Sequence, residues 1–375
     1  MNILIVEDVL NGHNGSVKIM RNIAYGFKKN NDVKIIYFGK SQDYKNVLPL
    51  LDGFDYHILY NKYFSFFESK IKKIILKKHL NFKIDDLPIF FLEFYLFKYL
   101  KKINYNPDFI IFSNPFASLA LIFGSKYKSI VYLHEAPLFD DFNYIVRKFI
   151  HLYLNILNIR STYISISMGT TGKINKNFTF NIGTKPPIAF LECDDCCNKE
   201  KFILLDTRWT ANRNPLFVLE IAKLMKNVKI IMHGVFVDNE IKDELNRIIE
   251  KKQYNIELIS NDTNEELINL YKKAMIVMRW SGINETGNSL SIIDAISYNC
   301  IPVMDKNLGI SKFIEDNISP DLVVNDMAKE FVKIALKIMN ENNFYKGVLS
   351  NVINCKKRYS WENYANNLLN NINNI

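Results

Sequence analysis

The segment SGINETGNSLSIIDAISYNCIPV, Ser281 to Val303, decides which fold the chain can adopt. A polar loop carries Glu285, an apolar-periodic run carries Asp294, and CIPVM then has the pattern of a buried strand. Preceded by the strand-like MIVMRW, this order is typical of a parallel sheet with crossover helices. Two explanations of the acids stay open: a solvated loop and a helix with one exposed acid, or a binding site that uses both carboxylates.

The rest of the second half alternates in the same way. Strand-like runs are FILLDTR, VKIIMHG, NIELIS and DLVVN, and helical runs between them are PLFVLEIAKLM, EIKDELNRIIEKK and NEELINLYKKA. Thr263 and Glu266 form a capping-box signature at the start of the last helical run. The first half repeats the alternation with NILIV, VKIIYFG, DFIIFS, SIVYLH, YISIS and FTFNIG. Short apolar strands between amphipathic helices predict parallel sheets with helices on both faces.

The alternation predicts an α/β chain of two doubly wound, Rossmann-like domains that face each other across a cleft. We place the first domain at residues 1–183 and the second at 201–357. Residues 184–200, TKPPIAFLECDDCCNKE, are polar and non-periodic and are predicted to be the linker. Residues 358–375 are predicted to form a helix that returns to the first domain. Ligands of such sheets bind at the carboxyl ends of the strands.

Composition indicates an ordinary globular protein of the cytoplasm. The 375 residues are 48% hydrophobic and 23% charged, and no apolar run reaches the roughly 18–20 residues of a membrane span. MNILIVED lacks a basic leader, so we predict no signal peptide. The five cysteines are an odd number and fit a reduced compartment. CDDCC has no second Cys or His pair at ligand spacing nearby, so we expect no metal site.

The net positive charge is confined to the first half of the chain. Residues 1–180 contain 24 Lys and Arg and 14 Asp and Glu, a net charge of +10. Within Asn61 to Lys83, aromatic and aliphatic side chains alternate with Lys70, Lys72, Lys73, Lys77 and Lys78. This pattern predicts an interfacial helix on an anionic membrane surface, and a solvated surface helix is the alternative. A nucleic-acid partner is not expected, because the basic run lacks a recognised binding motif.

Several residues at predicted strand ends could bind an anionic ligand. Arg208 ends a strand and Arg213 lies just before the next helix, which suits a diphosphate; two ordinary surface arginines are the alternative. Gly287, Asn288 and Ser289 stand where a helix begins, so main-chain N–H groups there favour an anion. An ordinary N-cap by Asn288 or Ser289 explains the same residues.

Two positions in the first half belong to the same set of candidates. NGHNGS follows the first strand without matching the dinucleotide-binding fingerprint, but Gly15 and Ser16 would let a ligand approach the main chain closely. His134, in YLHEAP, ends another predicted strand and is either functional or structural.

Taken in order, these features resemble the retaining, nucleotide-sugar-dependent glycosyltransferases of family 4, which have the GT-B fold. The resemblance runs nearly end to end and includes YNPDFIIFS, YLHE, ISISMGTTGKI, FNIG and RYSWENYA. The family pattern has two acids with seven residues between them, then a small-residue helix and a Pro-Val strand. Here eight residues separate Glu285 from Asp294, so that Thr286 takes the place of the first acid in an ungapped match.

The resemblance implies a role for each candidate. Glu285 would bind hydroxyls of the donor sugar and His134 would contact the sugar. Arg208 and Arg213, with the amides from Gly287 to Leu290, would stabilise the leaving diphosphate, and Asp294 would hold the ribose. The donor would be a nucleoside diphosphate sugar, no separate cofactor or metal is expected, and the acceptor would be a glycan, lipid or lipid-linked glycan. A non-catalytic sugar-nucleotide-binding subunit and an epimerase of the same fold are the alternatives.

Overall fold

The computed structural model describes residues 1–7, 15–38, 53–59, 96, 99–112, 128–133, 163–166, 188–191, 193, 198–260, 264–282, 289–325 and 327–373. The chain forms two compact units. The first unit contains Met1–Pro187 and Trp361–Ile375, and the second contains Ile188–Ser360. The described part of each unit is built on a six-stranded parallel sheet, as the alternation of strands and helices predicts.

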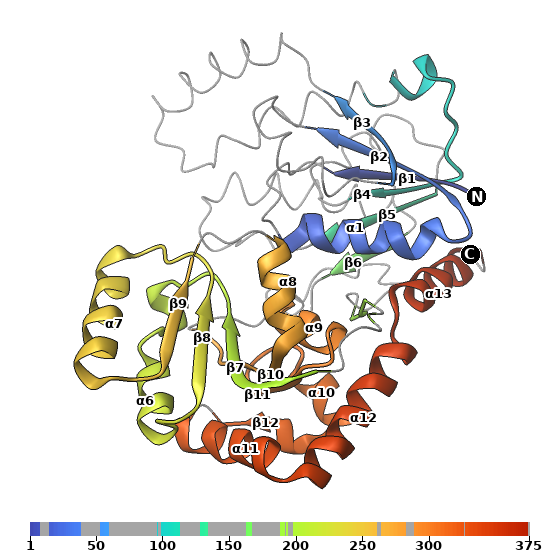
Figure 1. The fold of residues 1–375 in the computed structure, drawn as a ribbon. Coiled ribbons are helices and arrows are strands. Elements are labelled where there is room, and N and C mark those ends of the chain that lie inside the picture. Colours follow the sequence, from blue (N-terminus) through green and yellow to red (C-terminus); the bar gives the residue numbers. More distant parts are fainter. Residues whose placement is uncertain are drawn as a thin grey trace, which may run out of the picture. The chain divides into compact units, whose positions relative to one another are not determined.

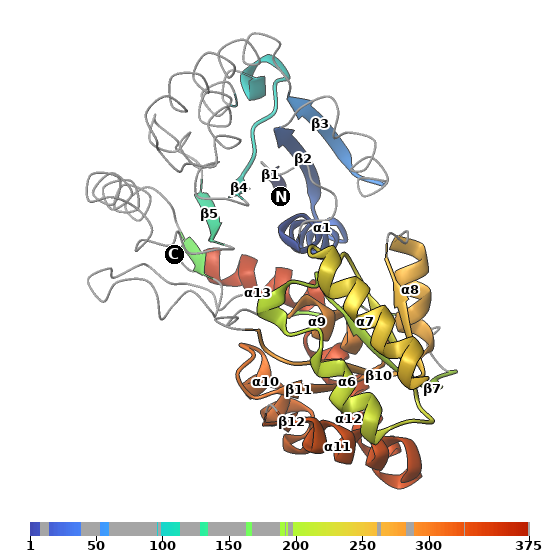
Figure 2. The ribbon, with the colours of Figure 1, turned by 90° about the vertical axis from the view of Figure 1, so that its left-hand side faces the viewer.

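The sheet of the first unit has the strand order β3-β2-β1-β4-β5-β6, and every described pairing is parallel. Figure 2 shows β3 at one edge and β1 within the sheet. Its strands are β1 (Asn2–Glu7), β2 (Asp32–Phe38), β3 (Asp55–Leu59), β4 (Phe109–Phe112), β5 (Lys128–Leu133) and β6 (Tyr163–Ile166). Strand β3 is not among the strands predicted from the sequence, and the predicted strand FTFNIG lies outside the described residues.

The C-terminal helix returns to the first unit, as predicted. Helix α13 (Trp361–Asn373) packs against α1 (Gly15–Lys28), which follows β1 (Figure 1). The two helices cross closely at Gly26, because a Cβ atom there would collide with the main-chain carbonyl of Trp361. Lys29 and Glu362 add an exposed ion pair with an N–O distance of 2.7 Å.

The sheet of the second unit has the strand order β12-β11-β10-β7-β8-β9, again with parallel pairings. Its strands are β7 (Glu200–Asp206), β8 (Lys229–His233), β9 (Ile256–Ile259), β10 (Ala274–Arg279), β11 (Ile301–Asp305) and β12 (Val323–Val324). The central strands β10 and β11 are buried along their whole length, because helices cover both faces of the sheet.

The helices of the second unit lie on both sides of its sheet (Figure 1). They are η5 (Ala211–Arg213), α6 (Phe217–Leu224), α7 (Asn239–Lys252), α8 (Asn264–Lys273), α9 (Leu290–Ser297), α10 (Ser311–Asn317), η6 (Pro320–Leu322), α11 (Ala328–Asn340) and α12 (Asn342–Arg358). The steps from β7 to β8 and from β10 to β11 run in opposite directions along the sheet. Right-handed crossovers therefore place α6 and α9 on opposite faces, where α11 packs on α6 and α12 packs on α9.

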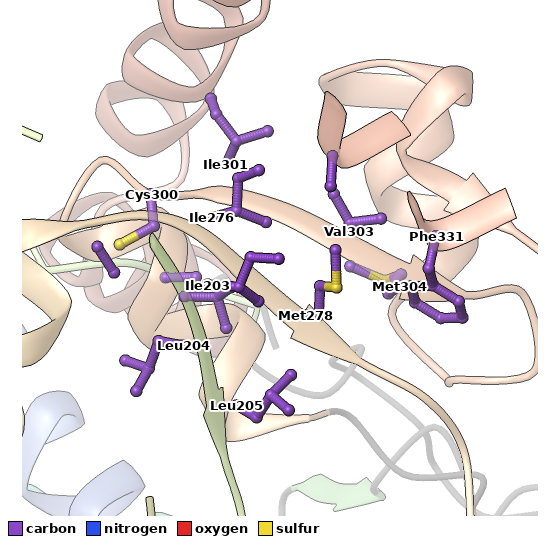
Figure 3. Packing of buried hydrophobic residues seen from close by; sticks show 14 of the residues in the cluster. Ile203, Leu204, Leu205, Ile276, Met278, Cys300, Ile301, Val303, Met304 and Phe331 are labelled. Atoms are coloured by element: carbon purple, nitrogen blue, oxygen red, sulfur yellow. The ribbon is translucent and has the colours of Figure 1, made fainter. Parts of the chain in front are cut away.

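Apolar side chains from neighbouring strands form the core of the second unit. Figure 3 shows residues of β7, β10 and β11 together with Phe331 of α11. The labelled side chains from the strands, with the residue that precedes β11, are Ile203, Leu204, Leu205, Ile276, Met278, Cys300, Ile301, Val303 and Met304. This core holds the carboxyl ends of β7 and β10 in fixed positions side by side.

Part of the predicted linker packs into the second unit. Phe190 is fully buried, and its N–H donates to the Tyr359 carbonyl at 2.9 Å. Lys199 Nζ donates to the carbonyls of Tyr271 and Tyr298 at 2.9 and 2.6 Å. The second unit therefore begins at Ile188, earlier than the boundary at residue 201 that composition suggests.

None of the helices in the described part of the chain is long and apolar enough to cross a membrane.

Candidate functional site

Arg208 and Arg213 lie in one turn at the carboxyl end of β7. Arg208 is exposed two residues after the strand, and Arg213 is the last residue of η5. The Arg213 guanidinium folds back on this turn, donating to Thr207 Oγ1 at 2.5 Å and to the Arg208 carbonyl at 2.9 Å. Asn214 then ends η5 in the left-handed conformation at φ 44°. The turn therefore carries one exposed arginine, Arg208, and one arginine, Arg213, whose guanidinium is held by hydrogen bonds within the turn.

The Arg208–Arg213 turn packs against the loop that follows β10. Trp280 Nε1 donates to the Arg213 carbonyl at 2.8 Å. Gly282 lies so close that a Cβ atom there would sit 2.7 Å from the Asn212 carbonyl oxygen and 3.1 Å from Arg213 Cγ. A side chain at position 282 would push the two loops apart. The loop that contains Glu285 thus starts directly beside the arginine turn.

Asp305, at the end of β11, fixes this loop from its other side. Its carboxylate accepts hydrogen bonds from the Ser281 hydroxyl and from the Ser281 N–H, the latter at 3.2 Å. The N–H of Asn307 donates to the other oxygen at 2.9 Å. Asp305 is completely buried, so its contacts hold the loop without help from solvent.

Helix α9 begins at the same edge of the sheet, since it connects the carboxyl end of β10 to the amino end of β11. Ser289 is its N-cap, but among the described residues its side chain makes no capping bond and lies 2.8 Å from the Ser291 hydroxyl. The first-turn amides, including that of Leu290, are therefore not capped by the Ser289 hydroxyl. Ser289 is thus the N-cap by position, as one explanation of this segment expects, but without a side-chain capping bond.

Asp294 lies within α9, as the sequence predicts, and is only 5% exposed. The alternative of a solvated mid-helix acid is therefore wrong. The far end of α9 is held by buried Lys356, which donates to Asn299 Oδ1 at 2.8 Å and to the Cys193 carbonyl at 2.9 Å. A cation at a helix C-terminus is stabilising, and here it also fixes the helix that carries Asp294.

Three hydrogen-bonded side chains, Asp206, His233 and Tyr271, join the ends of β7 and β8 to α8. Asp206 uses both carboxylate oxygens: one lies 2.8 Å from His233 Nδ1, and the other accepts the Tyr271 hydroxyl at 2.6 Å. Burial raises the pKa of Tyr271 well above its usual value, and the charges of Asp206 and Asp294 raise it further. Tyr271 therefore keeps its proton and acts as a donor to Asp206.

The turn after β8 contains Gly234, at a position where no other residue fits. Gly234 has φ 120°, and a Cβ atom there would collide with the Thr207 carbonyl. The His233 carbonyl accepts from Trp209 Nε1 at 3.0 Å, and the Trp209 ring stacks on Phe236. The turns after β7 and β8 are thereby tied together next to Asp206.

The structure brings Arg208, Arg213, Ser289, Leu290 and Asp294 to one unit, at strand ends and on α9. Gly15 and Ser16 are the first residues of α1 in the other unit. The remaining candidates lie outside the described residues: His134, Glu285, Thr286, Gly287, Asn288, Lys70, Lys72, Lys73, Lys77 and Lys78. Within the described part, no group of three or more His, Cys, Asp or Glu side chains is placed to hold a metal ion.

Three residues of this region, Asp206, His233 and Asp305, are not among the candidates predicted from the sequence. A signal was present, because each is the polar last residue of its strand and directly follows a run of apolar residues. Polar residues at the carboxyl ends of parallel strands are where ligands of doubly wound sheets bind.

Comparisons with known proteins identify the fold. No protein-family model and no curated sequence matches the chain. Among solved structures, HepE of Anabaena with bound UDP matches with TM-score 0.70 at 11% identity, over 100% of both chains. A glycosyltransferase of Rickettsia africae matches with TM-score 0.69 at 15% identity, over 100% of this chain and 98% of that one. A TarM variant of S. aureus, solved with UDP, fondaparinux and α-GlcNAc-glycerol, matches with TM-score 0.66 at 15% identity, over 99% of each.

At these identities the likeness establishes the fold. The chain has the GT-B fold, made of two Rossmann-like α/β units with a C-terminal helix that returns to the first.

Proposed function

We propose that the protein is a glycosyltransferase that uses a nucleoside diphosphate sugar. The observation that carries the proposal is the close packing of the arginine turn, at Asn212 and Arg213, against Gly282. This contact brings the turn that carries Arg208 and Arg213 beside the start of the loop that contains Glu285. The bound UDP in HepE and TarM, which have the same fold, supports a nucleotide-sugar donor.

The site residues suit this chemistry. Arg208, Arg213 and the first amides of α9 would stabilise the charge that develops on the leaving diphosphate, and fixed donors of this kind usually make the largest catalytic contribution. Asp294 would accept hydrogen bonds from the ribose, and Glu285 would accept them from hydroxyls of the sugar. His134, Gly15 and Ser16 would contact the donor from the other unit, and no metal is required.

In the proposed reaction, the bond from the anomeric carbon to the diphosphate breaks. A bond to the acceptor oxygen forms on the same face of the sugar, so that its configuration is retained. The acceptor proton passes to the leaving phosphate. We assign the enzyme to the hexosyltransferases of family 4, acting on a glycan, a lipid or a lipid-linked glycan.

Transfer of radiolabelled sugar tests the function directly. The protein is incubated with UDP-, GDP- or ADP-sugars and with glycan or glycolipid acceptors, and labelled product is separated from donor. Label in the acceptor supports a transferase. Conversion of the free donor to another sugar nucleotide without an acceptor would identify an epimerase, and binding without turnover would identify a non-catalytic subunit.

We further propose that the enzyme works at the cytoplasmic face of a membrane. The sequence supports this through the five lysines between Lys70 and Lys78, each worth about 1 kcal/mol near an anionic surface. Charge reversal of Lys72, Lys73, Lys77 and Lys78 should abolish binding to anionic vesicles and leave donor binding intact. If the unaltered protein ignores such vesicles at low salt, the membrane proposal is wrong and a soluble acceptor is the better choice.

A further inference from the structure

His233 has one ring nitrogen for which the described structure provides no partner. The residue is 9% exposed, and its Nε2 is buried without a hydrogen bond to any described residue. A buried polar atom without a partner costs free energy, so such atoms are rare in native proteins and call for an explanation.

The other ring nitrogen fixes the orientation of the imidazole. Nδ1 lies 2.8 Å from Asp206 Oδ1, while Asp206 Oδ2 is occupied by the Tyr271 hydroxyl. An ionised carboxylate only accepts, so Nδ1 carries a proton and donates a hydrogen bond to Asp206. In the neutral imidazole this leaves Nε2 as an acceptor, which takes an N–H or O–H donor as its partner.

The position of His233 indicates which part of a nucleotide sugar would supply this donor. β8 is the neighbour of β7, so His233 lies next to the strand end that precedes the arginine turn. Phosphate oxygens accept hydrogen bonds, so they can bind the arginines, which are donors. They cannot bind an unprotonated Nε2, which is itself an acceptor. Asp294, the proposed ribose-binding residue, is close enough to Tyr271 for its charge to affect that hydroxyl. Tyr271 in turn contacts the carboxylate that orients His233.

We propose that His233 is a specificity-determining residue of the donor site, whose Nε2 accepts a hydrogen bond from an N–H of the base or a hydroxyl of the ribose. The inference rests on the proposed function, since it requires a nucleotide donor. Asp206 and Tyr271 are then positioning residues that hold the ring in its accepting tautomer.

Two substitutions separate this role from a structural one. His233→Gln can place its amide oxygen near the position of Nε2, whereas His233→Asn can replace only Nδ1 and its contact with Asp206. UDP, GDP and ADP are first tested on the unaltered protein by calorimetry, and the nucleotide that binds most tightly becomes the probe. Inorganic pyrophosphate serves as a control that contains no nucleoside.

We expect His233→Gln to bind the nucleotide like the unaltered protein and His233→Asn to bind it about tenfold more weakly, the effect of one hydrogen bond. Pyrophosphate should bind equally to all three proteins. Nucleotide analogues methylated at the base N–H, or lacking one ribose hydroxyl, distinguish the two sources of the donor. The analogue without the relevant group should bind the unaltered protein and His233→Asn equally.

Three results would overturn the inference. These are weak binding by His233→Gln with normal binding by His233→Asn, equal nucleotide binding by all three proteins, or a parallel loss of pyrophosphate binding. If a variant does not fold, the nitrogen-15 resonance of Nε2 in the unaltered protein decides instead, because it should move with nucleotide and not with pyrophosphate. If no nucleotide binds the unaltered protein, the proposed function itself fails, and this inference fails with it.

Discussion

Trp280 and Arg213 are joined by a hydrogen bond of 2.8 Å from the indole nitrogen to the main-chain carbonyl. The Trp280 ring is buried against Phe217, with ring centroids 5.0 Å apart, and against Phe331. The Trp280 side chain therefore fastens the turn that carries both arginines to the hydrophobic core of its unit, in addition to buried Trp209 within the turn itself. The position of the candidate diphosphate site depends on core packing as well as on charge.

Trp280→Phe tests this dependence, because phenylalanine keeps aromatic packing and removes the donor. A lost hydrogen bond of this kind costs about 1 kcal/mol of stability. We expect a modest fall in melting temperature together with an increase in KM for the sugar nucleotide. Phe331→Leu is the matched control, since it loosens the same packing without touching Arg213. Equal KM values for the two variants would show that the hydrogen bond does not position the turn.

Arg208→Ala should lower transfer at least about thirtyfold. Removing one partner of a desolvated charge pair costs roughly 2–5 kcal/mol, and about 1.4 kcal/mol corresponds to tenfold in rate. The melting temperature should not change, because Arg208 is exposed. Arg247→Ala, at an exposed arginine of α7, is the control and should leave both quantities unchanged. Unaltered kinetics in a folded Arg208→Ala protein would remove the diphosphate assignment.

Glu285→Gln should be far more damaging to transfer than Thr286→Ala. A carboxylate can accept charge-assisted hydrogen bonds from two sugar hydroxyls, and neither an amide nor a threonine hydroxyl replaces it. The measurement is kcat/KM for the donor in each variant. The reverse ranking would mean that the ungapped match to the family pattern, which puts Thr286 in the place of the acid, is the correct one.

The stability of the chain should fall as pH rises from about 9 to 11. Burial raises the pKa of the Cys300 thiol from 9.0 to about 11, although Lys199 beside it acts in the opposite direction. Over this interval the unfolded thiol ionises while the folded one stays neutral, so the unfolded state binds fewer protons and is favoured.

Cys300→Ser removes this titration while keeping a donor for the Tyr271 carbonyl, which Sγ contacts at 2.9 Å. The free energy of unfolding, measured in urea at pH 8 and pH 10.5, should fall less in the variant. The difference is at most about 2 kcal/mol at pH 10.5, at about 1.4 kcal/mol per pH unit above 9. Identical losses in the two proteins would mean that Cys300 ionises equally easily in both states.

The sequence predicts the central strands well because both faces of a parallel sheet are buried. Strands such as β10 and β11 therefore appear as uninterrupted apolar runs. β3 lies at the edge of its sheet and contains Asp55 and His57, so its pattern resembles a polar loop. Its assignment needed the pairing with β2, which no local pattern encodes.

The same distinction applies to the candidate site. Arg208 and Arg213 could be found because they follow a clear strand within one short segment. The bond between Tyr271 and Asp206 could not, since its partners are 65 residues apart and meet only when α8 packs on the sheet. The burial of Asp294 likewise depends on long-range packing, in which α12 covers α9.

The crossing of α1 and α13 at Gly26 affects the order in which the chain can fold during synthesis. Residues Ile188–Ser360 are continuous, so the second unit is complete once Ser360 has left the ribosome. The first unit contains α1 but lacks its partner helix until residues Trp361–Ile375 are made. The half of the protein that is synthesised first is therefore the half that finishes folding last.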